Sequence, residues 1–370
     1  MSIRITLKTG REKPVRLGHP WIFSGAIASW SGPAHPGSVV DVISAGGEWL
    51  ARGLAEGGKN LAIRIYSRRE EEQLDVDFFA RKLRSAIAWR EREIFSQEPD
   101  TDAFRLCFSE ADGLSGLIVD RYHDRAVMIA EPPLKPFIPA LKDVLKTSGL
   151  STDIVAPVRI KESGFTYDVD ISAGQKTGFY LDQRVNRRRV ASFASGRRVL
   201  SCYCYTGGFE THLAHRGAFS ITAIDSSAMA IQQAQRNQQL NPGGMAVEYR
   251  IADVPAFLRT CRDARQTFDL IVLDPPKFVN SQAQIEKGLR AYKDINLLAM
   301  KLLTPGGILA SFSCSGWVKR DDFTKALAWA ALDAGRDVQI LEHLTQPPDH
   351  PVALHFPESD YLCGVIARIA

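Results

Sequence analysis

The feature that most constrains the fold is a regular alternation of short apolar runs and helical stretches in the second half of the chain. Apolar runs of strand length occur at residues 199–203, 221–225, 247–251, 268–274 and 308–313. Stretches with helical spacing lie between them, at residues 209–216, 227–240, 254–262 and 288–303. Strands that are apolar throughout are typical of parallel strands covered by helices on both faces. The pattern therefore predicts an α/β fold with a doubly wound, Rossmann-like sheet, to which residues 361–369 add one more strand.

The first half of the chain has a different organisation, and 370 residues are too many for one ordinary domain. Short strand-like runs at 3–7, 38–42 and 61–65 are separated by Gly and Pro and predict a small β-barrel. Residues 75–95 have helical spacing. Further strands are expected at 117–119, 126–130 and 154–158, and a helix at 136–146. We therefore predict a barrel over 1–70, a linking helix over 71–98, a central α+β domain with a β-hairpin over 99–183, and the Rossmann-like domain over 184–370.

Charge is distributed unevenly. Residues 1–69 hold ten Lys or Arg and four acidic residues, a net of +6, so the remaining residues carry −2 of the total of +4. A small basic unit beside a nearly neutral body is typical of a module that docks on a polyanion, with Lys13 and Arg16 as candidate phosphate contacts. A merely solubilising surface is the alternative.

The cysteines and the hydropathy pattern indicate the compartment. The six cysteines show no C-x-x-C pair and no paired His spacing, which predicts free thiols and no metal site. No apolar run approaches the roughly 20 residues that span a bilayer, and the first residues lack a signal-peptide pattern. We expect a cytoplasmic protein without a membrane partner, and the sequence leaves a homodimer open.

Polar and small residues follow the first four predicted strands of the Rossmann-like domain, where such sheets bind ligands. Small residues let backbone N–H groups approach a ligand, and a carboxylate after the second strand can hold a ribose. The absence of G-x-G-x-x-G argues against NAD and favours another adenosine cofactor. Alternatively, the two glycines only make a tight turn, and Asp253 only caps a helix. The candidate cofactor residues are Tyr205, Thr206, Gly207, Gly208, Asp225, Ser226, Asp253 and Asp274.

Six segments carry a more specific signal, at residues 174–184, 204–209, 273–278, 313–315, 349–351 and 356–358. In this order they resemble the motifs of the bacterial 23S rRNA large-subunit methyltransferase I family, which are cytosine-C5 enzymes. Residues 19–25 are similar to that family's PUA domain, a small RNA-binding β-barrel. The resemblance spans essentially the whole chain and implies S-adenosylmethionine (SAM) as cofactor and 23S rRNA, or its large-subunit precursor, as partner. It implies SAM contacts at Gln175, Lys176, Phe179, Tyr205, Gly207, Asp225 and Asp253.

Methylation at C5 of cytosine needs a nucleophile, because C5 becomes reactive only after a thiolate adds to C6. Cys314 ends the fifth predicted strand and Asp274 the fourth, so we predict that Cys314 attacks C6 while Asp274 holds the N3/N4 edge of the base. A buried packing role is the alternative for Cys314, and it is our interpretation of Cys202 and Cys204. Lys277, Arg184 and Arg187 are predicted to contact RNA phosphates, although a solvated helix face explains the arginines too.

Two other functions compete with this one. The sequence Asp274-Pro275-Pro276-Lys277-Phe278 is also typical of enzymes that methylate an exocyclic amine after stacking the base on an aromatic ring. A purine of rRNA would then be the target, and Cys314 would be incidental. A non-catalytic RNA-binding assembly factor that retains SAM is the remaining alternative.

Overall fold

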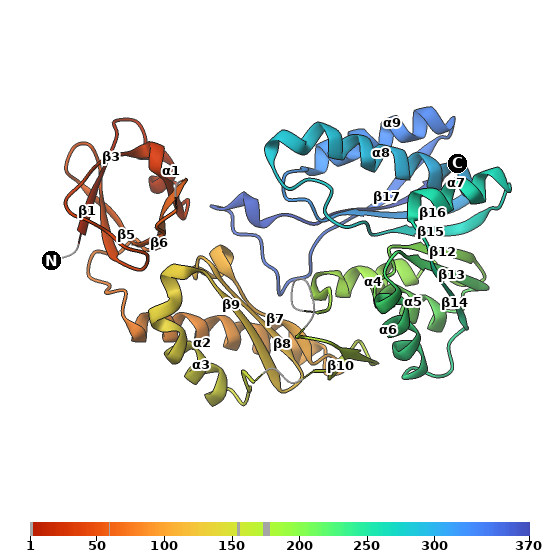
Figure 1. The fold of residues 1–370 in the computed structure, drawn as a ribbon, viewed down its shortest axis with the longest axis horizontal. Coiled ribbons are helices and arrows are strands. Elements are labelled where there is room, and N and C mark those ends of the chain that lie inside the picture. Colours follow the sequence, from red (N-terminus) through yellow and green to blue (C-terminus); the bar gives the residue numbers. More distant parts are fainter. Residues whose placement is uncertain (1–2, 59, 154–155, 173–177) are drawn as a thin grey trace. The chain divides into compact units, whose positions relative to one another are not determined.

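The computed structural model describes residues 3–58, 60–153, 156–172 and 178–370. The chain forms two compact units (Figure 1). The first consists of Met1–Ile160, Asp170–Gly178 and Pro348–Ser359, and the second of Lys161–Val169, Phe179–Pro347 and Asp360–Ala370.

The N-terminal part of the first unit is a curled six-stranded sheet, with the strand order β2-β6-β5-β4-β1-β3 (Figure 1). Its core contains fully buried Ile5, Val40 and Ile63. The three predicted strands are present as β1, β4 and β6, and the structure adds strands β2, β3 and β5, one turn of α-helix and a 3-10 turn at Ser24–Ala26. The elements are β1 (Ile3–Leu7), α1 (Lys13–Arg16), β2 (Trp21–Phe23), β3 (Ile27–Trp30), β4 (Val39–Ile43), β5 (Trp49–Ala55) and β6 (Leu61–Ser67).

The remainder of the first unit packs two helices on the three-stranded antiparallel sheet β7-β8-β9. Asp75 caps the first helix, since its side chain accepts a hydrogen bond from the Phe78 N–H at 2.8 Å. Both predicted helices are confirmed. The elements are α2 (Val76–Glu93), β7 (Ala103–Phe108), β8 (Leu117–Tyr122), β9 (Arg125–Ala130) and α3 (Ile138–Thr147).

The prediction of a strand over 154–158 is wrong in its position. Residues 154 and 155 lie outside the described residues, and β10 begins only at Val158 (Val158–Glu162). Pro157 has no N–H to contribute to a ladder, which explains why the strand begins after it. The partner strand β11 (Phe165–Val169) is held by α6 (Ala228–Gln239) and the residues after it: the N–H of Asp168 donates to Asn237 and that of Thr166 to Asn241, each at 2.9 Å. Residues 161–169 therefore belong to the second unit, and not to the predicted central domain.

The tail segment at 348–359 belongs to the first unit, where buried Arg90 and the backbone of Arg105 hold it. Arg90, fully buried in α2, makes a bidentate ion pair with Asp112 and donates two hydrogen bonds to the carbonyl of Asp349, at 3.2 and 2.9 Å. The Asp349 carboxylate accepts from the backbone N–H of Arg105 at 3.0 Å. In this structure, the motif around Asp349 therefore serves to dock the tail.

The second unit contains a seven-stranded sheet with the order β14-β13-β12-β15-β16-β18-β17. Strands β14 to β16 in this order are parallel, and β18 is antiparallel to both of its neighbours. The sheet therefore has the predicted doubly wound core with an antiparallel extension. Its strands are β12 (Arg198–Cys202), β13 (Ser220–Asp225), β14 (Val247–Ile251), β15 (Phe268–Leu273), β16 (Leu303–Ser313), β17 (Val338–Leu344) and β18 (Cys363–Ile369).

Helices cover both faces of this sheet (Figure 1). Alternate residues of each strand enter different cores: Leu200 packs beneath α7, α8 and α9, whereas Val199 packs against α4 and α5. The strands are thus buried on both faces, as their continuous apolar runs predicted. Besides α6, the helices are α4 (Arg184–Ala191), α5 (Gly208–His215), α7 (Val254–Asp263), α8 (Ile285–Leu302) and α9 (Arg320–Ala334).

Candidate active site

The ends of β12 and β13 are joined by the carboxylate of Asp225. One oxygen of Asp225 accepts from the backbone N–H of Tyr205 at 3.0 Å, and the other from the N–H of Ser227 at 2.9 Å. Tyr205 adopts a left-handed backbone conformation with φ +48°. Such conformations in non-glycine residues are sparsely populated and concentrate at functional sites. The structure therefore brings together two of the predicted cofactor residues in a fixed turn.

The glycines of this turn have no room for a side chain. Gly207 has φ +85°, and a Cβ placed on it would lie 3.1 Å from the Ala234 Cβ and from the hydroxyl of Tyr249. A Cβ on Gly208 would lie 2.6 Å from Nε of Arg187. The turn is therefore packed from behind, and α5 begins directly at it, which is the arrangement of a helix N-terminus that receives a polar ligand.

Behind the glycines lies a cluster of buried charges, here called the arginine cluster: Glu162, Arg187 and His212. Nη1 of Arg187 donates to both carboxylate oxygens of Glu162, at 2.8 and 2.7 Å, and His212 lies 3.5 Å from the same carboxylate. Burial alone would raise the pKa of Glu162, but Arg187 and His212 outweigh it and bring the pKa down to about 2. Glu162 is therefore charged and paired at neutral pH.

Arg187 also holds the segment that leads into α4. It donates to the carbonyl of Tyr180 at 2.6 Å, and its guanidinium lies 4.4 Å from the ring centre of Phe179. The predicted RNA contacts of Arg184 and Arg187 are wrong, because these side chains are only 0% and 3% exposed. Phe179 is buried as well, so its SAM contact stays a prediction. Gln175 and Lys176 lie outside the described residues.

Asp253 caps α7, because its side chain accepts from the N–H of Ala256 at 2.9 Å. The alternative considered from the sequence is therefore confirmed, while its contact with adenine stays a prediction. Tyr203, which the sequence did not single out, has φ +63°. Burial raises the pKa of its phenol, and the charges of Asp253 and Asp225 add to the rise.

Asp274 and Cys314 follow neighbouring strands, as predicted: Leu273 of β15 pairs with Ser311 of β16. The Cys314 Sγ lies 3.9 Å from the carbonyl oxygen of Pro275. Cys314 is half-buried, whereas the other five cysteines, Cys202 and Cys204 among them, are buried as predicted for packing residues. Asp274 and Cys314 are called the edge pair below.

The Asp274 carboxyl has an unusual protonation equilibrium. Burial, together with the nearby charge of Asp182, raises its pKa to about 7, and a hydrogen bond from Gln183 opposes this rise. Tyr180 is a missed residue of this site: it is 36% exposed, and its ring lies 5.1 Å from that of Tyr205. Burial raises the pKa of Tyr180, and the charges of Asp274 and Cys314 add to the rise.

The other predicted RNA contacts lie on the surface. Lys277, three residues after Asp274, is exposed, and so is Lys13 at the start of α1. Arg16 is exposed but forms a bidentate ion pair with Glu48. Exposed pairs are worth little, so a phosphate can compete with Glu48 for this arginine.

Comparison with known proteins agrees with this geometry. Residues 5–68 match a PUA-like domain family, and residues 145–365 match the family of S-adenosylmethionine-dependent methyltransferases. The chain is 42% identical to ribosomal RNA large subunit methyltransferase I of Shewanella amazonensis and 39% identical to that of Escherichia coli O139:H28, over 100% of both chains in each comparison. The chain belongs to this family. It is therefore a SAM-dependent methyltransferase, and the predicted fold and cofactor are confirmed.

Solved structures confirm the fold of this large subunit methyltransferase I homologue. A protein of Streptococcus mutans, provisionally described as a SAM-dependent methyltransferase, matches with a TM-score of 0.86 and 20% identity over 100% of both chains. At this level of identity the likeness shows the fold alone.

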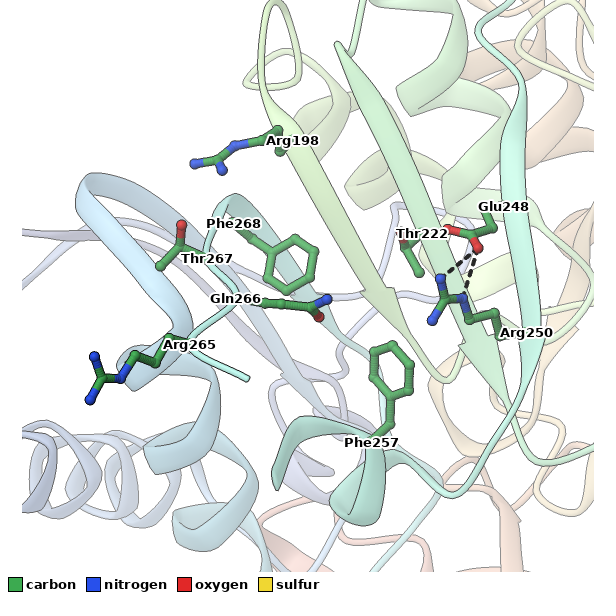
Figure 2. A pocket seen from close by; sticks show the side chains of 9 residues that line it. All are labelled: Arg198, Thr222, Glu248, Arg250, Phe257, Arg265, Gln266, Thr267 and Phe268. Atoms are coloured by element: carbon green, nitrogen blue, oxygen red, sulfur yellow. Dashed lines mark hydrogen bonds and ion pairs between the residues drawn. The ribbon is translucent and has the colours of Figure 1, made fainter. Parts of the chain in front are cut away.

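A further hollow lies in the second unit. Figure 2 shows a hollow of about 400 Å³ lined by Arg198, Arg250 and Phe257 among others, with Arg198 and Phe268 at the first positions of β12 and β15. It therefore lies away from the carboxyl ends that carry the edge pair. Within the described ranges, no group of three or more His, Cys, Asp or Glu could hold a metal. No helix in the described part of the chain is both long and apolar enough to cross a bilayer.

Proposed function

We propose that this methyltransferase I homologue transfers a methyl group to C5 of a cytosine in 23S rRNA, through a covalent bond between Cys314 and C6. The observation that carries the proposal is the edge pair: a half-buried thiol and a carboxyl at the ends of adjacent parallel strands. The names of the relatives support rRNA as the substrate. The substrate and the reducing environment expected for free thiols support a cytoplasmic location.

The residues of the glycine turn fit SAM. The helix start at Gly208 and the Asp225 carboxylate beside the turn suit a ligand with a ribose and charged groups. When bound there, SAM supplies an electrophilic methyl group. Asp225 and the backbone of the turn would hold it, and Tyr203 and Asp253 lie where further contacts with the nucleoside are expected.

The chemistry follows from the edge pair. The Cys314 thiolate forms a bond to C6, the electrons of the C5–C6 double bond shift towards N3, and Asp274 gives N3 a proton. C5 then has enamine character and accepts the methyl group. A water molecule takes the C5 proton, and the electrons of the C5–H bond re-form the C5–C6 double bond as the bond between sulfur and C6 breaks, which restores the aromatic ring and the thiolate. The proton on N3 returns to Asp274.

The RNA would be held outside this centre by the basic N-terminal sheet, with Lys13 and Arg16, and by Lys277 next to the edge pair. The rival N-methylation requires Phe278 as a free stacking platform. The Phe278 ring is half-buried and lies 4.8 Å from that of Tyr292, within the core beneath α8. This packing favours the C5 mechanism.

The proposal is tested with purified protein, SAM and 23S rRNA from a strain that lacks the protein. Digestion to nucleosides and mass spectrometry should detect one new 5-methylcytidine per rRNA. A methylated purine would support the N-methylation mechanism and contradict the proposal. No methylated nucleoside on naked or assembled rRNA would contradict both.

A further inference from the structure

A chain of buried amides leads from the body of the second unit to Asp274. Nε2 of Gln183 donates to Oδ1 of Asp274 at 3.0 Å, and Oε1 of Gln183 accepts from Nδ2 of Asn186 at 2.7 Å. Nδ2 of Asn186 also donates to the backbone carbonyl of Thr345 at 3.1 Å. Gln183 and Asn186 are each 2% exposed, so water does not compete for these bonds.

The backbone carbonyl of Thr345 fixes which amide group donates and which accepts along this series of hydrogen bonds. A backbone carbonyl can only accept hydrogen bonds, so the amide NH2 of Asn186 must face Thr345. The same NH2 group reaches Gln183, which must therefore present its oxygen to Asn186 and its NH2 group to Asp274. A flipped Gln183 would place two donors against each other at Asn186, and it would face the charged form of Asp274 with a second acceptor. Gln183 therefore donates its hydrogen bond to one particular oxygen of Asp274, Oδ1.

We propose that Gln183, oriented by Asn186, is a positioning residue that reserves Oδ1 of Asp274 as an acceptor and leaves Oδ2 to carry the proton that passes to the target base. The inference rests on the proposed function. In a neutral carboxyl the oxygen without the proton is the better acceptor, so the Gln183 contact favours protonation of Oδ2. N3 of cytosine has a lone pair and needs such a donor when sulfur adds to C6.

The surroundings of Asp274 suit this role. Its neutral form is populated near neutral pH, because burial raises its pKa to about 7. Asp182, which accepts from the Tyr361 hydroxyl at 2.6 Å, disfavours the charged form of Asp274, whereas Gln183 and the more distant charge of Arg187 favour it. The titratable and charged groups around Asp274 are Asp182, Tyr180, Arg187 and Cys314.

The first test replaces Gln183 by Leu and measures the single-turnover methylation rate against pH. The rate needs neutral Asp274, so it falls as pH rises through the pKa of this group. Loss of the Gln183 donor raises that pKa, so the descending limb should move to higher pH. The maximal rate should fall about tenfold or more, since the proton is no longer held towards the base. Calorimetric SAM affinity and RNA affinity should be unchanged.

The second test uses Asn186→Asp to reverse the orientation of the Gln183 amide. The introduced carboxylate has no N–H to donate, so Gln183 turns its NH2 group towards it and offers its oxygen to Asp274. The proton of Asp274 is then drawn to Oδ1, away from the base, and the rate should fall at least as far as in Gln183→Leu. The matched control is Asn296→Asp. Asn296 in α8 is fully buried and donates to the Tyr292 carbonyl at 2.7 Å. It takes no part in the hydrogen bonds that link Thr345, Asn186, Gln183 and Asp274.

The control should keep the wild-type pH profile, even if it loses as much stability as Asn186→Asp. A wild-type rate and profile in Gln183→Leu, or an equal shift of the limb in Asn296→Asp and Asn186→Asp, would overturn the positioning role. Lowered SAM affinity in Gln183→Leu would assign Gln183 to general support of the site and would also overturn it. A failure of the proposed function is distinguished from these outcomes, because the wild-type protein itself would then form no 5-methylcytidine.

Discussion

The arginine cluster and the edge pair each contain a carboxyl group of the second unit, and the surroundings shift the pKa values of these two groups in opposite directions. Glu162 is fully buried but faces Arg187, and its pKa falls to about 2. Asp274 is half-buried, accepts a hydrogen bond from the neutral amide of Gln183 and lies near Asp182, and its pKa rises to about 7. A buried acid with a full counter-charge keeps one protonation state and stabilises the fold. An acid with a neutral donor can change its state near neutral pH, as proton transfer requires.

The largest expected effect is on the edge pair. Cys314→Ser should lower the methylation rate by at least about 10³-fold, because a hydroxyl supplies almost no anion at neutral pH and the nucleophile is lost. SAM affinity and unfolding should stay as in the wild type. The control Cys204→Ala, at a buried cysteine, should remain active under the same single-turnover conditions. Substantial activity in Cys314→Ser would remove covalent catalysis from the account.

Substitutions in the arginine cluster should lower the stability of the fold. Arg187→Met leaves Glu162 buried without its counter-charge, so the free energy of unfolding should fall by about 3–5 kcal/mol. The additional change Glu162→Gln should restore part of this loss. Urea denaturation measures both. Arg189→Met is the control: this exposed arginine pairs with Glu342 on the surface, and its loss should cost about 0–1 kcal/mol.

If Arg187 instead bound RNA, as the sequence suggested, Arg187→Met would leave the unfolding curve unchanged. It would then reduce the salt dependence of RNA affinity.

Asp225, the acid beside the glycine turn, should affect the binding of SAM. Asp225→Asn should weaken SAM binding by about 1–3 kcal/mol, because the ribose hydroxyls lose a charged acceptor. Asp253→Asn, at an exposed helix cap, should have a smaller effect. Calorimetry at one pH compares the two variants. Equal affinities of Asp225→Asn and the wild type would place the ribose elsewhere.

The smallest effect is expected at Lys13, whose proposed role is to bind an RNA phosphate and not to take part in the reaction. Lys13→Ala should reduce the slope of log affinity against log salt by about one unit or slightly less for RNA, with SAM affinity unchanged. A filter-binding series across salt concentrations measures the slope. An unchanged slope would show that Lys13 does not neutralise a phosphate.

The sequence was most informative where apolar periodicity is strong. Continuous runs such as those at Val199 and Leu270 predicted the buried parallel strands, and neighbouring strand ends brought Asp274 to Cys314. The helix α9 and the edge strand β17 were missed, because exposed Trp329, Leu332 and Leu341 blur the amphipathic pattern of these elements.

Burial of charge could not be read from local sequence. The run of arginines after Asp182 looks like a solvated helix face, yet Arg187 points inwards because Glu162, 25 residues earlier, supplies a buried carboxylate. The Gln183 chain likewise depends on the Thr345 carbonyl, 159 residues beyond Asn186. Such contacts are properties of the tertiary fold, and local spacing does not reveal them.

The central claim is that the Cys314 sulfur bonds to C6 of the target cytosine, and RNA that carries 5-fluorocytidine at the methylated position tests it directly. After methyl transfer, C5 bears fluorine in place of hydrogen, so elimination fails and the adduct persists. The account predicts a band of retarded mobility on a denaturing gel that requires SAM, forms with Cys204→Ala and is absent with Cys314→Ala. A SAM-dependent band that persists in Cys314→Ala, or methylation by the wild type without any band, would contradict it.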